Sequence, residues 1–147
     1  MTYSLLLLLH LFAAFIFVGT VFFEVLILEN VRKHLPRDTM RAVEVAIGNR
    51  ARAIMPWTLL VLYLAGIGMA SQYSAELAHP FSNRLGLLLS IKILLAISVF
   101  GHFATAMVWR KRGLLKGRRS RILHLSVFSH LVLIVLLAKS LFHPFGF

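Results

Sequence analysis

Residues 85–109 read LGLLLSIKILLAISVFGHFATAMVW, an apolar stretch in which Lys92 and His102 are the ionisable side chains. An α-helix needs about 20 apolar residues to cross the hydrocarbon core of a bilayer. Three further stretches of this kind cover residues 3–28, 53–71 and 122–142. Because lipid offers no hydrogen-bond partners to a peptide backbone, these stretches are predicted to cross as helices.

The composition excludes most soluble classes of protein. The chain has 147 residues, of which 59% are hydrophobic and 14% charged, whereas soluble domains carry roughly 25% charged residues. The chain contains no cysteine, which excludes a disulfide scaffold, a zinc–thiolate site and a cysteine nucleophile. We therefore predict an all-α integral membrane protein, an antiparallel four-helix bundle that forms one transmembrane domain over residues 1–147.

The net charge of +11 is concentrated in two connections. The basic residues between the first two spans are Arg32, Lys33, Arg37, Arg41, Arg50 and Arg52, and those between the last two are Arg110, Lys111, Arg112, Lys116, Arg118, Arg119 and Arg121. The positive-inside rule places both connections in the cytoplasm and both termini outside, as in a multi-pass protein of a bacterial-type inner membrane. Topology and anionic lipid head groups explain this charge better than nucleic acid does. The expected partner is thus the lipid bilayer, with homo-oligomerisation left open.

The first basic connection also has a helical pattern. Apolar residues recur at helical spacing over residues 40–47, which predicts an amphipathic turn lying on the inner leaflet. The sequence shows no evident internal repeat, so we expect one compact domain.

Ionisable residues inside the spans are costly in lipid and are therefore functional candidates. At 1.5 Å per residue, His10 and Lys92 lie about 10 and 12 Å below the outer surface. His102 and His130 differ in depth by about 3 Å, and His102 and His124 by about 6 Å. The first of these pairs is the leading candidate to hold a haem iron between two helices. Interhelical hydrogen bonding is the alternative role for His10, His102 and His130, and contact with the lipid interface is the alternative for His124.

Haem b and copper are the two cofactors that this residue set favours. Histidine is the usual axial ligand of haem, and helix bundles build cofactor sites from side chains on facing helices. The haem and metal candidates are therefore His10, His102 and His130. Copper would instead use Met69 with His79 and His143. The five methionines form no paired Met motif, so we expect haem b first and copper second.

Residues 10–19 read HLFAAFIFVG, with a histidine, an aromatic residue two turns on and a glycine soon after. This stretch resembles the start of HemJ-type protoporphyrinogen oxidases and CopD-type copper-resistance proteins, with Phe17 in place of their usual tryptophan. Residues 52–56, RAIMP, followed by Gly66, resemble a HemJ pattern, and Lys92 matches a lysine of both families. Residues 124–130, HLSVFSH, depart from the Asn-Glu-x-Pro stretch of HemJ proteins, which leaves the role of the last span open.

The resemblance implies a haem-binding redox protein that oxidises protoporphyrinogen, a tetrapyrrole substrate, or transfers electrons to quinone. His10 and Lys92 would be the residues that act on the substrate, which leaves the chain either an oxidoreductase or a binding protein. The propionates of the tetrapyrrole would pair with Lys92 or with Arg110 and Arg112. The CopD side of the resemblance implies copper handling instead.

Overall fold

The computed structural model describes residues 3–115 and 117–142, which are all-α. The helices are α1 (Tyr3–Phe22), α2 (Glu29–Val31), α3 (Arg37–Ala70), α4 (Ser74–Ala78), α5 (Arg84–Lys111) and α6 (Gly117–Phe142), with a π-helical segment (Phe23–Leu28) between α1 and α2 and a 3-10 turn (Ser71–Tyr73) between α3 and α4. Within these described ranges, four helical segments are long and apolar enough to cross a membrane: Tyr3–Val31, Arg37–Ala78, Arg84–Lys111 and Gly117–Leu141. The all-α class with four spanning helices is thus confirmed.

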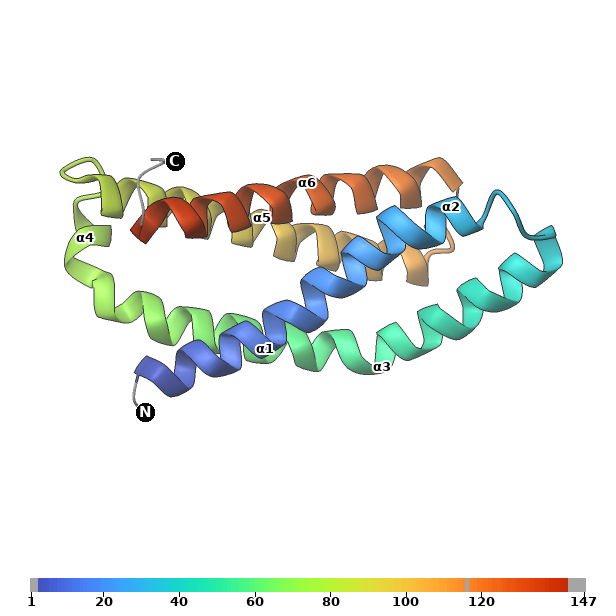
Figure 1. The fold of residues 1–147 in the computed structure, drawn as a ribbon, viewed down its shortest axis with the longest axis horizontal. Coiled ribbons are helices and arrows are strands. Elements are labelled where there is room, and N and C mark those ends of the chain that lie inside the picture. Colours follow the sequence, from blue (N-terminus) through green and yellow to red (C-terminus); the bar gives the residue numbers. More distant parts are fainter. Residues whose placement is uncertain (1–2, 116, 143–147) are drawn as a thin grey trace. The chain divides into compact units, whose positions relative to one another are not determined.

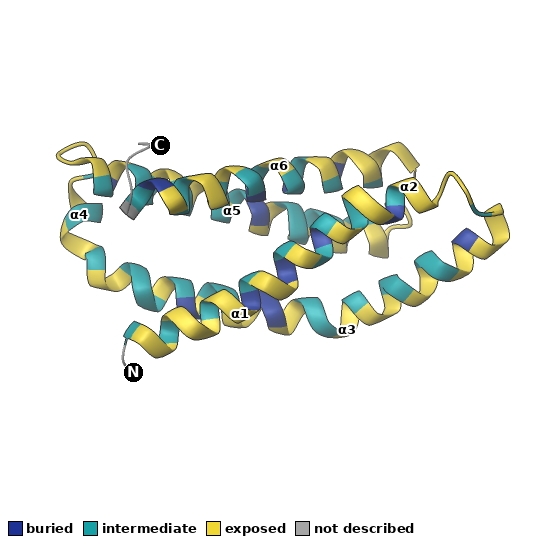
Figure 2. Ribbon diagram, in the orientation of Figure 1, coloured by how far each residue is buried: buried dark blue, intermediate teal, exposed yellow. Residues whose placement is uncertain are grey.

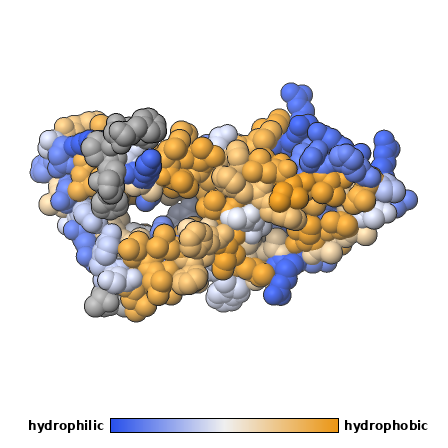
Figure 3. Space-filling model, in the orientation of Figure 1, coloured by the Kyte–Doolittle hydropathy of each residue, from blue (hydrophilic) through white to orange (hydrophobic). Residues whose placement is uncertain are grey.

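The apolar side chains of these helices mostly face outward. Within the most apolar window of each segment, only 6–17% of the residues are buried in the protein, and Phe15 is 72% exposed. Exposed and half-buried residues far outnumber the buried ones along these helices (Figure 2), and on the face drawn in Figure 3 hydrophobic side chains cover the middle stretches of the helices. Apolar surface on this scale needs an apolar solvent, so the helices contact lipid.

The chain forms two compact units, of which the first ends at Gln72. In the first unit, α1 packs against α3 with the two helices running in opposite directions (Figure 1). The His10 Nδ1–H donates to the Leu62 carbonyl oxygen at 2.9 Å. A Cβ on Gly66 would lie 3.3 Å from His10 Cε1, so the absence of a side chain at Gly66 lets the imidazole approach the α3 backbone.

Replacing Gly66 with alanine is expected to lower the free energy of unfolding in detergent by about 1–3 kcal/mol. The new methyl group would press on His10, which cannot move away without losing its bond to Leu62. The matched control is Gly19→Ala on α1, where a Cβ would meet nothing within 4 Å. Equal stability of the two variants in denaturant titrations would show that His10 is not held against Gly66.

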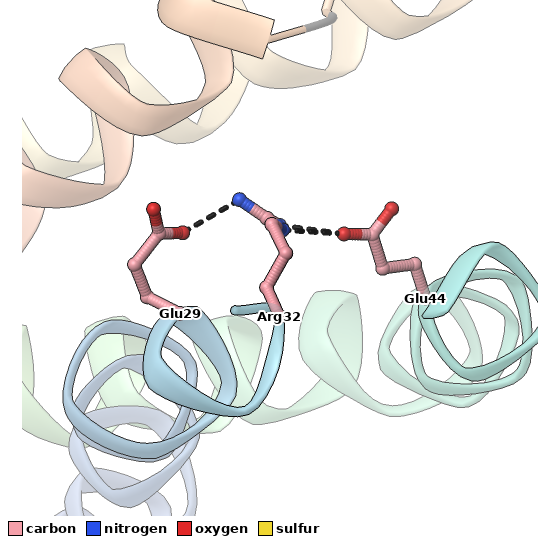
Figure 4. Close-up of polar contacts among 3 residues, drawn as sticks. All are labelled: Glu29, Arg32 and Glu44. Atoms are coloured by element: carbon pink, nitrogen blue, oxygen red, sulfur yellow. Dashed lines mark hydrogen bonds and ion pairs between the residues drawn. The ribbon is translucent and has the colours of Figure 1, made fainter. Parts of the chain in front are cut away.

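A small ion-pair network ties the end of α2 to α3 (Figure 4). Arg32 contacts Glu29 Oε2 through Nη1 and Glu44 Oε1 through Nη2, each at 2.6 Å. The Arg32 side chain is 46% exposed, so each pair contributes little to stability. The network of one arginine and two glutamates has a net charge of −1, and the connection between the first two spans stays basic because of its other basic residues, Lys33, Arg37, Arg41, Arg50 and Arg52.

The helical pattern predicted over residues 40–47 is confirmed, although these residues form part of the long helix α3 and not a separate amphipathic turn. α3 begins directly after Pro36 and continues through Pro56 to Ala70. Pro56 lacks the N–H that would bond to the carbonyl of Arg52, yet residues on both sides of it remain helical. The second membrane-spanning helix is therefore a continuation of the basic segment, and it begins well before the span predicted for residues 53–71.

The second unit begins at Tyr73 and pairs α5 with α6 in opposite directions (Figure 1). At one end of this pair, Arg84 Nη2 donates to the Ser140 carbonyl oxygen at 3.2 Å. The Asn83 side chain caps α5 by accepting from the Gly86 N–H at 2.7 Å. α4 packs against α5 at this end, where a Cβ on Gly86 would lie 2.6 Å from the Glu76 carbonyl oxygen.

Candidate functional site

Two histidines and two serines join α5 to α6 in the middle of the second unit. Ser126 Oγ lies 2.8 Å from His102 Nε2, and Ser98 Oγ lies 3.1 Å from His130 Nε2. The two imidazole centroids are 5.1 Å apart. We call these four residues the His–Ser clasp. Each interhelical hydrogen bond in a membrane protein contributes about 0.6–2 kcal/mol, so the clasp stabilises this helix pair.

The hydrogen bonds of the clasp determine which ring nitrogen carries the proton. His102 Nδ1 lies 2.7 Å from the Ser98 carbonyl oxygen, and His130 Nδ1 lies 2.7 Å from the Ser126 carbonyl oxygen. A carbonyl oxygen only accepts, so both Nδ1 atoms carry the hydrogen. In the neutral form, each ring therefore presents a lone pair on Nε2, to which the serine hydroxyl of the facing helix donates.

The clasp is formed by two copies of one short sequence motif. Residues 98–102 read SVFGH and residues 126–130 read SVFSH. On antiparallel helices the two copies face each other, so each serine meets the histidine of the other copy. The two valines, Val99 and Val127, are both buried beside the clasp. The expectation of no internal repeat is therefore wrong, and this repeat is the signal that would have identified Ser98 and Ser126.

A groove of about 520 Å³ lies between α5 and α6 on one side of the clasp. This volume falls within the range of about 300–1,000 Å³ that is typical of small-molecule sites. His102 and Ser126 both line the groove, and a Cβ at Gly101 would meet nothing within 4 Å, so that wall is open. The remaining lining residues are Ser98, Thr105, Trp109, Arg119, Ile122 and Leu123.

Arg119 gives this groove a positive charge. Its guanidinium lies 5.9 Å from the centroid of the Trp109 ring, within cation–π distance. In the described part of the chain, no acidic residue pairs with Arg119. Arg110, one of the residues expected to pair with a propionate, is exposed at the end of α5 and does not line the groove. Sequence reasoning missed Arg119 because several arginines near the same end of the helix pair looked equivalent.

The packing of His102 beside His130 does not fit a haem held between them. Two histidines on opposite faces of a haem each bind iron at about 2 Å, which places their ring centres roughly 6 Å apart with the macrocycle between. Here the rings are 5.1 Å apart and each Nε2 meets a serine. A haem between the two rings would require each Nε2 to leave its serine, and the contacts that the structure shows are interhelical hydrogen bonds, the alternative weighed from the sequence. Iron ligation by this pair stays a prediction. His102 alone of the pair lines the groove.

The other predicted site residues lie elsewhere. His10 bonds to Leu62 in the first unit, whereas Lys92 lies half-buried on α5 in the second. His124 lies half-buried on α6 outside the groove lining. Of the residues proposed for copper, Met69 lies in the first unit and His79 lies in the second, where it is exposed just after α4. His143 lies outside the described residues. Their roles as ligands stay predictions.

No family model, curated protein or solved structure matches the chain. The resemblance to HemJ and CopD proteins thus stays a prediction. The fold and the exposed apolar surface define the class: an all-α, multi-pass membrane protein. Its second unit carries a paired histidine–serine motif beside a groove with a cationic side chain.

Proposed function

We propose that this protein is a haem-b-binding redox protein of the cell membrane, with haem in the groove between α5 and α6 and His102 as its axial ligand. The observation that carries the proposal is the state of His102. Its Nδ1–H is held by a backbone carbonyl and its Nε2 lone pair lies at the groove wall. Metal-ligating histidines almost always have their other ring N–H anchored in this way.

The rest of the groove also suits a flat ligand with acidic groups. Its volume, its open wall at Gly101 and its largely apolar lining accommodate a planar macrocycle. Arg119 would pair with a propionate, because a guanidinium matches the geometry of a carboxylate. When bound, haem supplies one-electron chemistry, while the protein positions it and sets the surrounding charge.

The reaction that we propose for the bound haem is based on the resemblance to HemJ proteins. By that resemblance the substrate is protoporphyrinogen, quinone is the electron acceptor, and Lys92, on the same helix as His102, acts on the substrate. The role expected for His10, in the first unit, stays a prediction. The positive-inside rule places the basic connections in the cytoplasm of a bacterial-type cell and both termini outside. Rescue of a strain that lacks protoporphyrinogen oxidase tests this enzymatic extension, and failure to rescue despite bound haem would leave electron transfer as the function.

The cofactor is tested by analysing protein purified in mild detergent from the membranes of its host. We expect a Soret band and a pyridine haemochrome spectrum of haem b in stoichiometric amount. Stoichiometric copper without haem would contradict the proposal and would favour the copper-handling alternative. Absence of both would reject each cofactor.

The charge of Arg119 provides a second prediction. Arg119→Gln is expected to weaken haemin binding about two- to fivefold, because an exposed ion pair contributes up to about 1 kcal/mol. Added salt should reduce the difference from the wild-type protein, since it screens exposed charges. The neighbouring Arg118, exposed and outside the groove lining, is the matched control. Equal weakening by Arg118→Gln in absorbance titrations would show a general effect of charge rather than a contact at Arg119.

A further inference from the structure

The two halves of the His–Ser clasp are alike in sequence but not in surroundings. Both residues of the half formed by His102 and Ser126 border the groove with Trp109 and Arg119, whereas in the other half Ser98 lines the groove and His130 does not. When residues 98–102 are aligned with residues 126–130, Leu137 corresponds to Trp109 and Ile91 corresponds to Arg119. At the positions that correspond to Trp109 and Arg119, the surroundings of His130 are therefore apolar.

We infer that the two halves have different tasks: the Ser126 hydroxyl competes with incoming ligands for His102 Nε2, whereas the Ser98–His130 bond stays in place and keeps α5 and α6 in register. The inference rests on the proposed function, because it assigns the ligand exchange to the same groove. The distance of 2.8 Å from Ser126 Oγ to His102 Nε2 means that the lone pair is already occupied in the free protein. A ligand must therefore displace the hydroxyl.

When a ligand displaces the Ser126 hydroxyl from His102 Nε2, the hydroxyl can donate to another acceptor. Two other serines of α6, Ser129 and Ser140, donate to the carbonyl oxygen four residues earlier, at 3.0 and 2.9 Å. The same rotation would direct the Ser126 hydroxyl to the Ile122 carbonyl. Since serine makes such bonds readily within a helix, the exchange does not strand a polar group in lipid.

The tautomer of His102 also defines the ligand class. With the hydrogen on Nδ1, Nε2 accepts and does not donate. A partner at this atom must be an electron-pair acceptor such as a metal centre, or a hydrogen-bond donor such as a hydroxyl or pyrrole N–H. The carbonyl oxygen of an oxidised quinone only accepts, so it is excluded from direct contact with His102 Nε2 in this tautomer.

The repeat supplies a matched pair of variants, Ser126→Ala and Ser98→Ala. We expect Ser126→Ala to bind haemin roughly two- to tenfold more tightly than the wild-type protein, because the free variant leaves the His102 Nε2 acceptor without its donor, whereas in the bound state the metal occupies that atom in both proteins. Ser98→Ala removes the equivalent bond from His130, but Ser126 still occupies His102 Nε2, so this variant should not bind haemin more tightly than the wild-type protein. Histidine ¹⁵N NMR of the ligand-free variants should show the change at His102 Nε2 for Ser126→Ala and at His130 Nε2 for Ser98→Ala.

A second probe separates this inference from the haem proposal. Zn²⁺ is a small electron-pair acceptor, and its coordination is read at the His102 resonance. If none of the three proteins binds haemin but Ser126→Ala binds Zn²⁺ at His102 more tightly than Ser98→Ala does, the haem proposal fails and the exchange stands. Equal affinities of the two variants for both probes, or weaker binding by Ser126→Ala, would overturn the exchange.

Discussion

Replacing His102 with alanine is expected to weaken haemin binding by more than about 100-fold and to remove the Soret band from the purified protein. Loss of a residue that only orients a metal ligand typically costs 10–100-fold in affinity, and His102 is proposed as the ligand itself. The change also removes the acceptor of the Ser126 hydroxyl. The Ser98–His130 bond remains, so α5 and α6 should still pair, and circular dichroism should show unchanged helix content.

The control for this variant is His34→Ala. His34 bonds through Nδ1 to the carbonyl oxygen four residues earlier, at 3.0 Å, as His102 does. It is exposed and lies in the first unit, outside the groove. Retention of full haem content by His102→Ala, or its loss in His34→Ala alone, would remove His102 from the site.

The second large effect is expected at Gly86. In Gly86→Ala the new Cβ would lie 2.6 Å from the Glu76 carbonyl oxygen and 3.2 Å from Asn83 Oδ1. The first of these is a backbone atom, so α4 must move away from α5 and the cap on Gly86 N–H is strained. We expect the free energy of unfolding to fall by about 3 kcal/mol or more, at the upper end of the cost of overpacking.

Gly101→Ala, on the same helix, separates this clash from a general effect of alanine. A Cβ at Gly101 meets nothing within 4 Å, and alanine favours a helix over glycine by about 1 kcal/mol. Thermal unfolding in detergent should thus leave Gly101→Ala at least as stable as the wild-type protein. A Gly86→Ala protein of wild-type stability would show that α4 does not pack on α5 as described.

The fold was predictable because each spanning helix needs only a long apolar stretch, and residues 85–109 supply one within the observed helix α5. The length of α3 was not predictable in the same way. Hydropathy marks where a helix enters lipid, but it does not mark where the helix begins, and α3 starts in a basic segment at Arg37. Pro56, which favours a break in a soluble helix, lies inside it.

The candidate site was predictable only in part. Counting residues placed His102 and His130 at similar depth, and their rings lie 5.1 Å apart. Depth alone does not show what each ring contacts, and in the structure each Nε2 lies against a serine of the facing helix. Iron binding by the pair stays a prediction. The choice between Arg110 and Arg119 depended on which arginine faces the groove, and that orientation follows from the packing of α6 on α5.

Titration of the full chain with zinc protoporphyrin, followed by histidine ¹⁵N NMR, tests the central claim most directly. This porphyrin is diamagnetic and takes one axial ligand, so the resonances of the seven histidines identify which ring binds the metal. We predict that His102 Nε2 shifts to a metal-coordinated value while its Nδ1–H remains in place. Coordination by His10 or another histidine, or no coordination at all, would contradict a haem site between α5 and α6.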